Sequence, residues 1–392
     1  MPLIIRLAHR DPAEGHRVAT PLELLFDLSS VIAIAAAAAG LHHAVAHAHY
    51  GEGVIVFLLS FFGIWWAWMN WTWFSSAYDD GSPAYRILSF VIMSGAVVMA
   101  SGVEQFFDHH RLTLVLAGYL IMRGGMILLW LMAAAGDPDH RPTALRYAGG
   151  TVFAQVCWTL LIYGYGEWGP LFIGLFVLCG LIEMAVPFWA ERHGMTPWHR
   201  HHIIERYSLL TIIVLGEALL SVAMALQALA AATSDLTGAT DAHGATSGFD
   251  IRFVHLAIAS LVIAFSMWTL YFTRDEHLGS RRHALAFTWG YGHVVIFAAG
   301  AAIGSGIAVL GDILAGKAHI PLAVGDAAVA IPAALYLFGL WFVRDRYNLS
   351  GARAFLLPVA ALLCLGTPFL PVALEALSLV MLVTAVIRSR IA

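Results

Sequence analysis

The sequence predicts an all-α integral membrane protein with about twelve transmembrane helices. Three observations predict this class: the composition, the length of the apolar runs and the distribution of arginine. The 392-residue chain is 60% hydrophobic and only 12% charged, whereas a soluble domain carries about 25% charged residues. So little charge excludes a soluble globular protein. Strands are excluded because the runs are too long and lack the period-2 alternation of a transmembrane barrel.

The apolar runs have the length that a helix needs to cross a bilayer, about 20 residues. Twelve runs meet this requirement: 22–41, 53–74, 84–106, 112–135, 144–164, 168–190, 204–231, 252–273, 283–311, 320–343, 352–367 and 369–387. Gly366, Thr367, Pro368 and Pro371 crowd the junction of the last two runs, so these runs could instead form one re-entrant hairpin.

Positive charge is distributed unevenly between alternate loops. Counted from an N-terminus inside the cell, the inside segments hold 17 of the 21 Lys and Arg residues. The outside loops hold only Arg111, Arg252 and Lys317, and Arg123 lies within a run. This asymmetry predicts an even number of spans, both termini in the cytoplasm and the 233–250 loop outside.

Twelve runs divide into two sets of six, which predicts a tandem repeat in parallel orientation. "WTWFSSAYDDGS" ends the second run and "WTLYFTRDEHLGS" ends the eighth, so that Trp71 matches Trp268. The predicted organisation is a cytoplasmic N-terminal segment at 1–21, a first six-helix half at 22–190, a cytoplasmic linker at 191–203, a second six-helix half at 204–387 and a cytoplasmic tail at 388–392.

An acidic pair stands at the start of the first run. Glu23 and Asp27 are four residues apart and therefore share one helix face. Two like charges this close can share a proton or bind a cation. The alternative is structural, because acids near a helix N-terminus are favoured by the helix dipole, and Thr20 or Pro21 suits a helix start.

Glu217 lies near the middle of the 204–231 run, where an ionised carboxylate costs about 2.5–3.5 kcal/mol. We expect it to face the bundle interior, to be partly protonated and to belong to a proton or cation site. The preceding Gly216 would allow a close helix neighbour. Expected partners are Arg123 or the acidic pair of the first run; the alternative is a structural hydrogen bond.

Three further polar residues lie inside runs and complete the predicted transport site. Arg123 is a mid-span cation and must pair or face water. Glu183 lies deep in the sixth run. His293 lies in the ninth run, where it could relay a proton or be a satisfied core residue.

Two motifs flank these residues. An aromatic and polar cluster ends the second run, with Trp68, Asn70, Trp71, Asp79 and Asp80. Glu205 and Arg206 open the seventh run, next to the basic "WHRHH" (198–202), which we expect to contact anionic lipid headgroups.

Neither a metal site nor a cofactor nor a catalytic residue is predicted. His43, His47 and His49 in the first outside loop are weak metal candidates, and a solvated loop is the simpler interpretation. Dinucleotide-binding, P-loop, metalloprotease and hydrolase motifs give no credible match.

Two segments resemble one known family. "TPLELLFDLSSVIAIA" (20–35) fits the pattern E-L-x-F-D-L, and "ERYSLLTIIVLGEALLSV" (205–222) fits E-R-x-x-L-x-x-I-I-x-L-G-E. Together they are similar to the bacterial low temperature requirement protein A family, over nearly the whole chain. The resemblance implies a multi-spanning bacterial inner-membrane protein and implies no particular chemistry.

Function must therefore be inferred from the intramembrane residues. Buried carboxylates on several runs favour a proton- or cation-coupled secondary transporter of an unidentified small molecule or ion. The alternatives are a proton or cation channel, a membrane-embedded enzyme acting on lipid or quinone, and a scaffold or sensor. The lipid bilayer is the expected partner, nucleic acid is not, and a homo-oligomer remains open.

Overall fold

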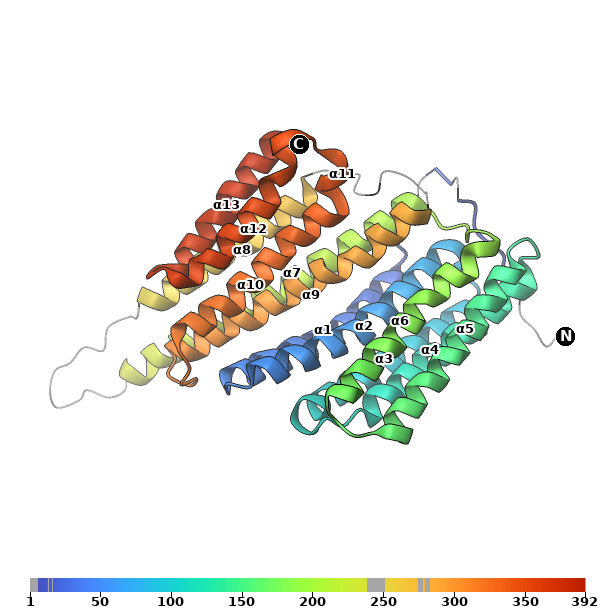
Figure 1. Cartoon of the computed structure of the whole chain (residues 1–392), viewed down its shortest axis with the longest axis horizontal. Helices are drawn as coiled ribbons and strands as arrows, with labels where there is room; N and C mark the ends of the chain where they lie inside the picture. The colour runs from blue at the N-terminus through green and yellow to red at the C-terminus, as the bar shows by residue number, and fades with distance from the viewer. Residues whose placement is uncertain are drawn as a thin grey trace. The chain divides into compact units, whose positions relative to one another are not determined.

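The computed structural model describes residues 6–12, 14–15, 17–237, 251–273, 278 and 283–391. Within these residues the regular secondary structure is helical, and no strand occurs among them. The α-helices, labelled in Figure 1, are α1 (Pro21–Ala46), α2 (Tyr50–Tyr78), α3 (Pro83–His109), α4 (Thr113–Gly136), α5 (Arg141–Thr159), α6 (Pro170–Ala190), α7 (Arg200–Thr237), α8 (Ile251–Phe272), α9 (His283–Leu314), α10 (Leu322–Leu340), α11 (Arg346–Asn348), α12 (Leu356–Gly366) and α13 (Ala373–Ile391). Short π-helical segments prolong α5 at Leu160–Tyr165 and α10 at Trp341–Asp345.

The predicted all-α class is confirmed, and each of the twelve predicted runs coincides with a helix. The number of spans is confirmed only in part. Ten helices are long and apolar enough to cross a membrane by length and composition. Among the described residues, α5 and α13 are not among these ten. Helix α5 carries Arg141, Arg146 and Gln155, and α13 carries Glu375, Arg388 and Arg390.

The chain forms two compact units. Unit 1 consists of Met1–Ala37 and Val56–Leu209, and unit 2 of Ala38–Ile55 and Leu210–Ala392. Helices α1, α2 and α7 therefore contribute residues to both units. Each unit is described by itself below.

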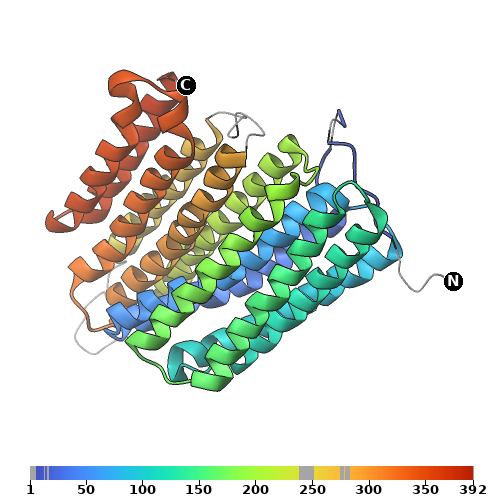
Figure 2. The same ribbon diagram turned by 45° about the vertical axis from the view of Figure 1, so that its right-hand side comes forward.

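Unit 1 packs neighbouring helices in chain order: α3 against α4, α4 against α5 and α5 against α6. Figures 1 and 2 show these helices, in teal to green, running alongside one another. Glycine brings α3 and α4 together. A Cβ added at Gly118 would lie 2.3 Å from the backbone nitrogen of Met99, and one added at Gly95 would lie 2.7 Å from the Gly118 carbonyl oxygen. Such close backbone approach is typical of helix pairs in membranes, where small residues line the interface.

Unit 2 contains the contacts of α9 with α10, of α8 with α9 and α13, and of α12 with α10 and α13. The α9–α10 contact also depends on glycine, since a Cβ added at Gly306 would lie 2.4 Å from the carbonyl oxygen of Ala328. Figure 1 shows α10, α12 and α13 of this unit in orange and red.

Burial follows the pattern of a protein dissolved in lipid. Large apolar side chains such as Leu362 and Phe369 are exposed, at 69% and 88%. Charged side chains such as Glu23, Arg206 and Arg344 are fully buried within the helical units. Lipid tails solvate the apolar surface, and polar groups inside the bundle must find partners there.

The predicted repeat is not confirmed. Trp71 is fully buried, whereas its proposed counterpart Trp268 is 51% exposed. The matched residues Asp275, Glu276, Gly279 and Ser280 lie outside the described residues, as does most of the 233–250 loop.

Candidate functional site

Glu23 lies at the start of α1, and its two carboxylate oxygens have different partners. Oε2 accepts a hydrogen bond from the backbone N–H of Thr20 at 2.7 Å, and the Thr20 hydroxyl accepts one from the Glu23 N–H at 3.3 Å. This reciprocal pattern is a capping box, and Pro21 stands at the first helical position. Glu23 therefore caps the start of α1, as the structural alternative expects, but only its Oε2 atom takes part in the cap.

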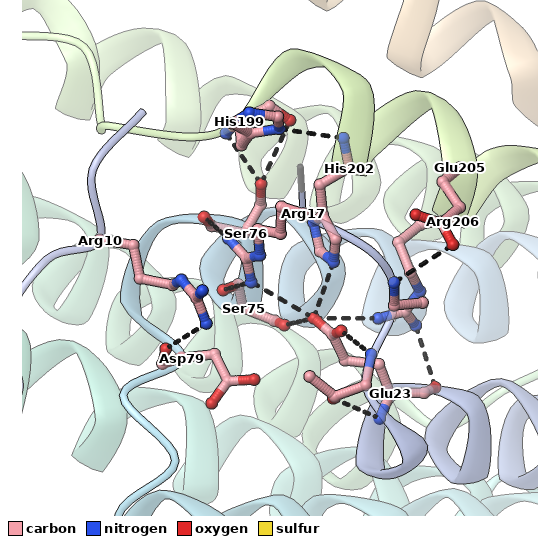
Figure 3. A network of polar contacts seen from close by, with 12 residues as sticks. Arg10, Arg17, Glu23, Ser75, Ser76, Asp79, His199, His202, Glu205 and Arg206 are labelled. Atoms are coloured by element: carbon pink, nitrogen blue, oxygen red, sulfur yellow. Dashed lines mark hydrogen bonds and ion pairs between the residues drawn. The ribbon is translucent and has the colours of Figure 1, made fainter. Parts of the chain in front are cut away.

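The other oxygen, Oε1, is the meeting point of a buried polar cluster. Nε2 of His202 lies 3.0 Å from it, and guanidinium nitrogens of Arg17 and Arg206 each lie 3.5 Å from it. The Ser75 hydroxyl donates a short hydrogen bond to the same oxygen. Figure 3 shows these side chains pointing toward Glu23 from the N-terminal segment, α2 and α7.

Asp27 lies one turn further along the same face of α1, as the i,i+4 spacing predicts. Its Oδ1 accepts hydrogen bonds from Nη2 of Arg206 at 2.5 Å and from the Trp68 indole at 2.7 Å. Among the described residues, none donates a hydrogen bond to the buried Oδ2 of Asp27 or bonds Nδ1 of His202. Each of these two atoms can therefore still accept or release a proton or bind a small polar ligand.

Aromatic rings of α1, α2 and α7 enclose the cluster. Phe26 stacks on Trp71 with ring centroids 3.9 Å apart, and the Arg206 guanidinium lies 5.3 Å from the Trp71 centroid. Trp68 contacts Tyr207 edge to face at 5.0 Å. These rings exclude bulk water, and in the resulting low dielectric each ionic interaction becomes stronger. The predicted aromatic cluster thus lines the centre formed by Glu23, Asp27, His202 and Arg206, called the α1–α7 centre below.

The N-terminal segment contributes a fifth residue, Arg17, which is included in the α1–α7 centre from here on. Its guanidinium is buried and donates to the backbone carbonyls of Ser75 and, through a short contact, Ser76. Burial lowers the pKa of Arg17, and the charge of Glu23 opposes that effect. The segment is held in place by His199, whose Nε2 lies 2.8 Å from the Glu14 carbonyl oxygen.

The formal charges of the centre balance. The cations Arg17 and Arg206 offset the anions Glu23 and Asp27, so that a neutral His202 leaves the set without net charge and a protonated one adds a single charge. Buried ion clusters are tolerated in a membrane bundle only when charges pair in this way. Protonation of His202 or of Asp27 therefore changes the net charge of the centre by one.

A second ionic centre of unit 1 joins α4 to α6. Arg123 donates to Glu183 at 2.6 Å and to the Tyr119 hydroxyl at 2.9 Å. Tyr119 and the Trp158 indole in turn donate to Oε2 of Glu183 at 2.6 and 2.8 Å. The requirement that Arg123 find a partner is thus satisfied by Glu183 inside unit 1.

Tyr119 and Trp158 also line a small apolar cavity of about 40 Å³ in unit 1. The cavity lies among α2, α3, α4, α6 and the π-helical end of α5. Its lining offers few polar groups beyond the edges of these two rings, so the cavity gives the Arg123–Glu183 pair no open polar binding site.

Glu217 belongs to unit 2 and is half-buried. Its carboxylate makes no hydrogen bond or ion pair with a described residue of that unit, while its backbone carbonyl accepts the Ser221 hydroxyl at 3.1 Å. The close helix approach expected at Gly216 occurs instead at Gly304 of α9, where an added Cβ would lie 3.3 Å from the Glu217 backbone. The role of the Glu217 side chain stays a prediction.

His293 is buried in unit 2 and bonded at both ring nitrogens. Nδ1 lies 2.7 Å from the Trp289 carbonyl oxygen, and Nε2 lies 3.2 Å from the Tyr271 hydroxyl. These contacts match a neutral imidazole that donates from Nδ1 and accepts at Nε2. The alternative of a satisfied core histidine fits this geometry.

The remaining predicted residues have local roles. Glu205 accepts the Ala19 N–H at 3.2 Å, Asn70 donates to the Trp66 carbonyl at 2.8 Å, and Asp80 accepts the Ser82 N–H at 2.9 Å. Asp79 is buried and accepts the Gly81 N–H at 2.9 Å.

The three histidines expected as weak metal ligands do not converge among the described residues. The His47 ring bonds the His43 carbonyl at 2.8 Å, and His49 is exposed.

The sequence alone did not identify several partners of the buried acids. His202 was assigned to a basic run expected to contact lipid headgroups, but His199 and His202 are both buried inside unit 1. The pattern that could have indicated this role is the i,i+4 spacing of His202 and Arg206, which places both on one helix face.

A third ionic centre was also missed by the sequence analysis. Asp345 of unit 2 accepts hydrogen bonds from Arg388 at 2.8 Å and from Arg344 at 2.7 Å.

Long apolar helices that bury charged clusters inside helical units define a polytopic helical membrane protein with internal ionic centres. A family model described as "Bacterial low temperature requirement A protein (LtrA)" matches residues 18–389, and the chain belongs to that family. The resemblance noted in the two sequence motifs is confirmed.

One curated relative is an uncharacterized protein of Rhizobium meliloti (strain 1021), 28% identical over 209 residues. The match covers 51% of this chain and 49% of the relative, so the chain matches about half the length of that protein. No solved structure matches the chain at a significant level.

Proposed function

We propose that this protein is a proton-coupled secondary transporter of the bacterial inner membrane and that the α1–α7 centre is its proton-binding site. One observation carries the proposal: within a fully buried, charge-balanced cluster, the His202 imidazole lies 3.0 Å from the Glu23 carboxylate. Imidazole and carboxylate are the groups that bind and release protons most readily near neutral pH.

Proton binding changes which groups hold α1 to the start of α7. With a neutral His202, Arg206 serves both Glu23 and Asp27, at 3.5 and 2.5 Å. A proton on His202 adds a cation 3.0 Å from Glu23, closer than Arg17 and Arg206 at 3.5 Å, so that Arg206 interacts mainly with Asp27. This switch couples protonation to the contact between the two helices, which a secondary transporter requires.

For the transporter as a whole we propose the architecture predicted from the sequence. The protein has twelve spans in two six-helix halves, at 22–190 and 204–387, with both termini in the cytoplasm. The half-buried Glu217 is proposed to serve proton movement in the second half. The substrate is a small molecule or ion whose chemistry these residues do not specify.

Proton uptake by reconstituted liposomes tests the proposal. Liposomes carry a trapped pH-sensitive dye, and a deproteinised bacterial metabolite extract is added outside. The wild-type protein should acidify the interior in a saturable, extract-dependent manner. His202→Gln keeps hydrogen bonding but cannot carry a proton, so it should lose the saturable component, as should Asp27→Asn.

Matched controls are His193→Gln and Asp108→Asn, because both residues are exposed and outside the centre. Both should transport like the wild type. Wild-type activity in His202→Gln and Asp27→Asn would overturn the proton site. Proton flux that needs only an imposed membrane potential, without extract, would show a channel in place of a transporter.

A further inference from the structure

Three elements of unit 1 bring a further group of ionisable side chains together, made of residues that belong to none of the ionic centres described above. Asp137 follows the last residue of α4 in an extended conformation, and His140 directly precedes α5. His9 comes from the N-terminal segment. One ligand atom from each of these three residues lies within 4.8 Å of the other two.

The ligand atoms converge on one carboxylate oxygen. Nδ1 of His140 lies 2.8 Å from Oδ2 of Asp137, and Nδ1 of His9 lies 3.2 Å from the same oxygen. A tetrahedral zinc ion with bonds of about 2.0–2.2 Å holds its ligand atoms about 3.3–3.5 Å apart. Small movements of the side chains therefore suffice to admit an ion among them.

The carboxylate is prepared to act as a ligand. The backbone N–H of His140 holds Oδ1 at 3.2 Å, and the Tyr78 hydroxyl donates to Oδ2 at 3.2 Å. Such outer hydrogen bonds are what orients metal ligands in proteins.

The N-terminal segment is fixed on both sides of His9. The Leu7 N–H donates to the Met132 carbonyl at 3.2 Å, and the Arg10 N–H donates to the Ala77 carbonyl at 2.8 Å. Gly136 permits this docking, because a Cβ there would lie 2.0 Å from the Leu7 carbonyl oxygen. His9 is 43% exposed at its side chain, which gives an ion a path from solvent.

We propose that His9, Asp137 and His140 form a binding site for a divalent transition metal of the zinc class. Two imidazoles and one carboxylate suit Zn²⁺ and its neighbours, whereas Mg²⁺ and Ca²⁺ prefer oxygen ligands only. Water occupies the fourth position. On binding, the ion takes the place of the protons between the Nδ1 atoms and Oδ2, so that both imidazoles bind in their neutral form.

The bound metal ties the N-terminal segment to the α4–α5 turn. The same segment continues to Arg17, which contacts Glu23 of the α1–α7 centre. Metal occupancy therefore stabilises the docked segment that delivers Arg17. The metal site itself stands independently of the proposed transport function.

Cobalt binding to the purified full-length protein, after chelator treatment, tests the site. Co²⁺ should give the visible absorption bands of a tetrahedral ion at one equivalent per chain, and Zn²⁺ should abolish them. Asp137→Asn, His140→Ala and His9→Ala should each weaken binding by about tenfold or more. The neighbouring exposed Asp139→Asn and the exposed His193→Ala should bind as the wild type does.

Two results would overturn the site. One is the absence of saturable Co²⁺ binding by the wild type. The other is unchanged binding in all three ligand variants, which would assign the metal to adventitious histidines elsewhere. His9→Ala removes an exposed side chain from the terminal segment, so it remains informative if a buried variant fails to fold. Trypsin provides a separate readout, since Zn²⁺ should slow cleavage after Arg10 in the wild type and not in His9→Ala.

Discussion

Arg206 shows how single charges are kept inside an apolar bundle. Its guanidinium reaches both acids of α1, the Glu23 carbonyl oxygen and the face of Trp71. Few other side chains could replace it, because only a guanidinium offers several donors in a planar fork that also stacks on an aromatic ring. Removing one member of such a buried pair leaves the other without a countercharge, at a cost of about 3–5 kcal/mol.

The Arg123–Glu183 pair allows that cost to be measured away from the proposed proton site. Glu183→Gln keeps the shape but removes the countercharge of Arg123, so the unfolding free energy should fall by about 3–5 kcal/mol. Thermal or denaturant unfolding in detergent gives the value. The control is Glu104→Gln on the exposed face of α3, which should change little. Equal stability of Glu183→Gln and wild type would show that Arg123 is solvated.

The buried Asp79 should make the stability of the fold depend on pH in an unusual direction. Burial raises its pKa, with a contribution from the charge of Glu23, against the Gly81 N–H and the charges of Arg17 and Arg10. A raised pKa in the folded state means that this residue stabilises the fold at acid pH and loses that contribution as the pH rises through the raised value. Asparagine resembles the neutral acid. Asp79→Asn should therefore be more stable than wild type at neutral pH, with a difference that shrinks toward the ordinary pKa of aspartate.

Melting temperatures recorded over a pH series provide this comparison. The exposed neighbour gives the control, since Asp80→Asn should show no such convergence. A variant Asp79→Asn that melts below the wild type at neutral pH would mean that Arg10 and Arg17 hold Asp79 ionised.

At the scale of elements, hydropathy located the helices well because each run is close to the bilayer thickness. It did not locate their contacts. The α3–α4 interface depends on glycines whose positions carry no hydropathy signal, and Gly216, singled out beside Glu217, is not the glycine at which α7 and α9 approach.

Two glycines of α4 give a matched test of that packing. Gly118→Ala places a Cβ 2.3 Å from the Met99 backbone nitrogen, so the helices must separate and the protein should be destabilised. Gly124→Ala meets no described atom within 4 Å and should be neutral or stabilising, by up to about 1 kcal/mol from helix propensity. Thermal unfolding compares them. Equal melting temperatures for the two variants would contradict the assigned α3–α4 contact.

At the scale of the whole molecule, the sequence identified most of the acids but few of their partners. Glu23 and Asp27 stood out by spacing and Arg206 by a motif, yet the contact between Arg206 and Asp27 joins residues separated by 179 positions. A single sequence carries no signal for such a pairing. Arg17 and His202 were missed for a different reason. Basic residues near a membrane surface usually contact lipid headgroups, so the sequence favoured that role over a buried contact.

Orientation is a second property of the whole chain that remains a prediction. The arginine asymmetry places residue 247 outside the cell. A cysteine introduced at Ser247, in a chain whose native Cys157, Cys179 and Cys364 are replaced, should react with an impermeant thiol reagent in intact cells. Labelling only in inverted vesicles would reverse the topology and place the N-terminal segment outside.

Infrared difference spectroscopy of the protein in lipid, between about pH 5 and pH 8, reports directly whether the α1–α7 centre exchanges a proton. We expect a pH-dependent carboxyl or imidazole signal that Asp27→Asn and His202→Gln remove or alter and that Asp27→Glu shifts in frequency. The exposed control Asp108→Asn should leave the signal intact. Spectra that are identical for wild type and all three centre variants would rule out proton exchange, because the cluster would then be a fixed ion-pair network that only holds α1 and α7 together.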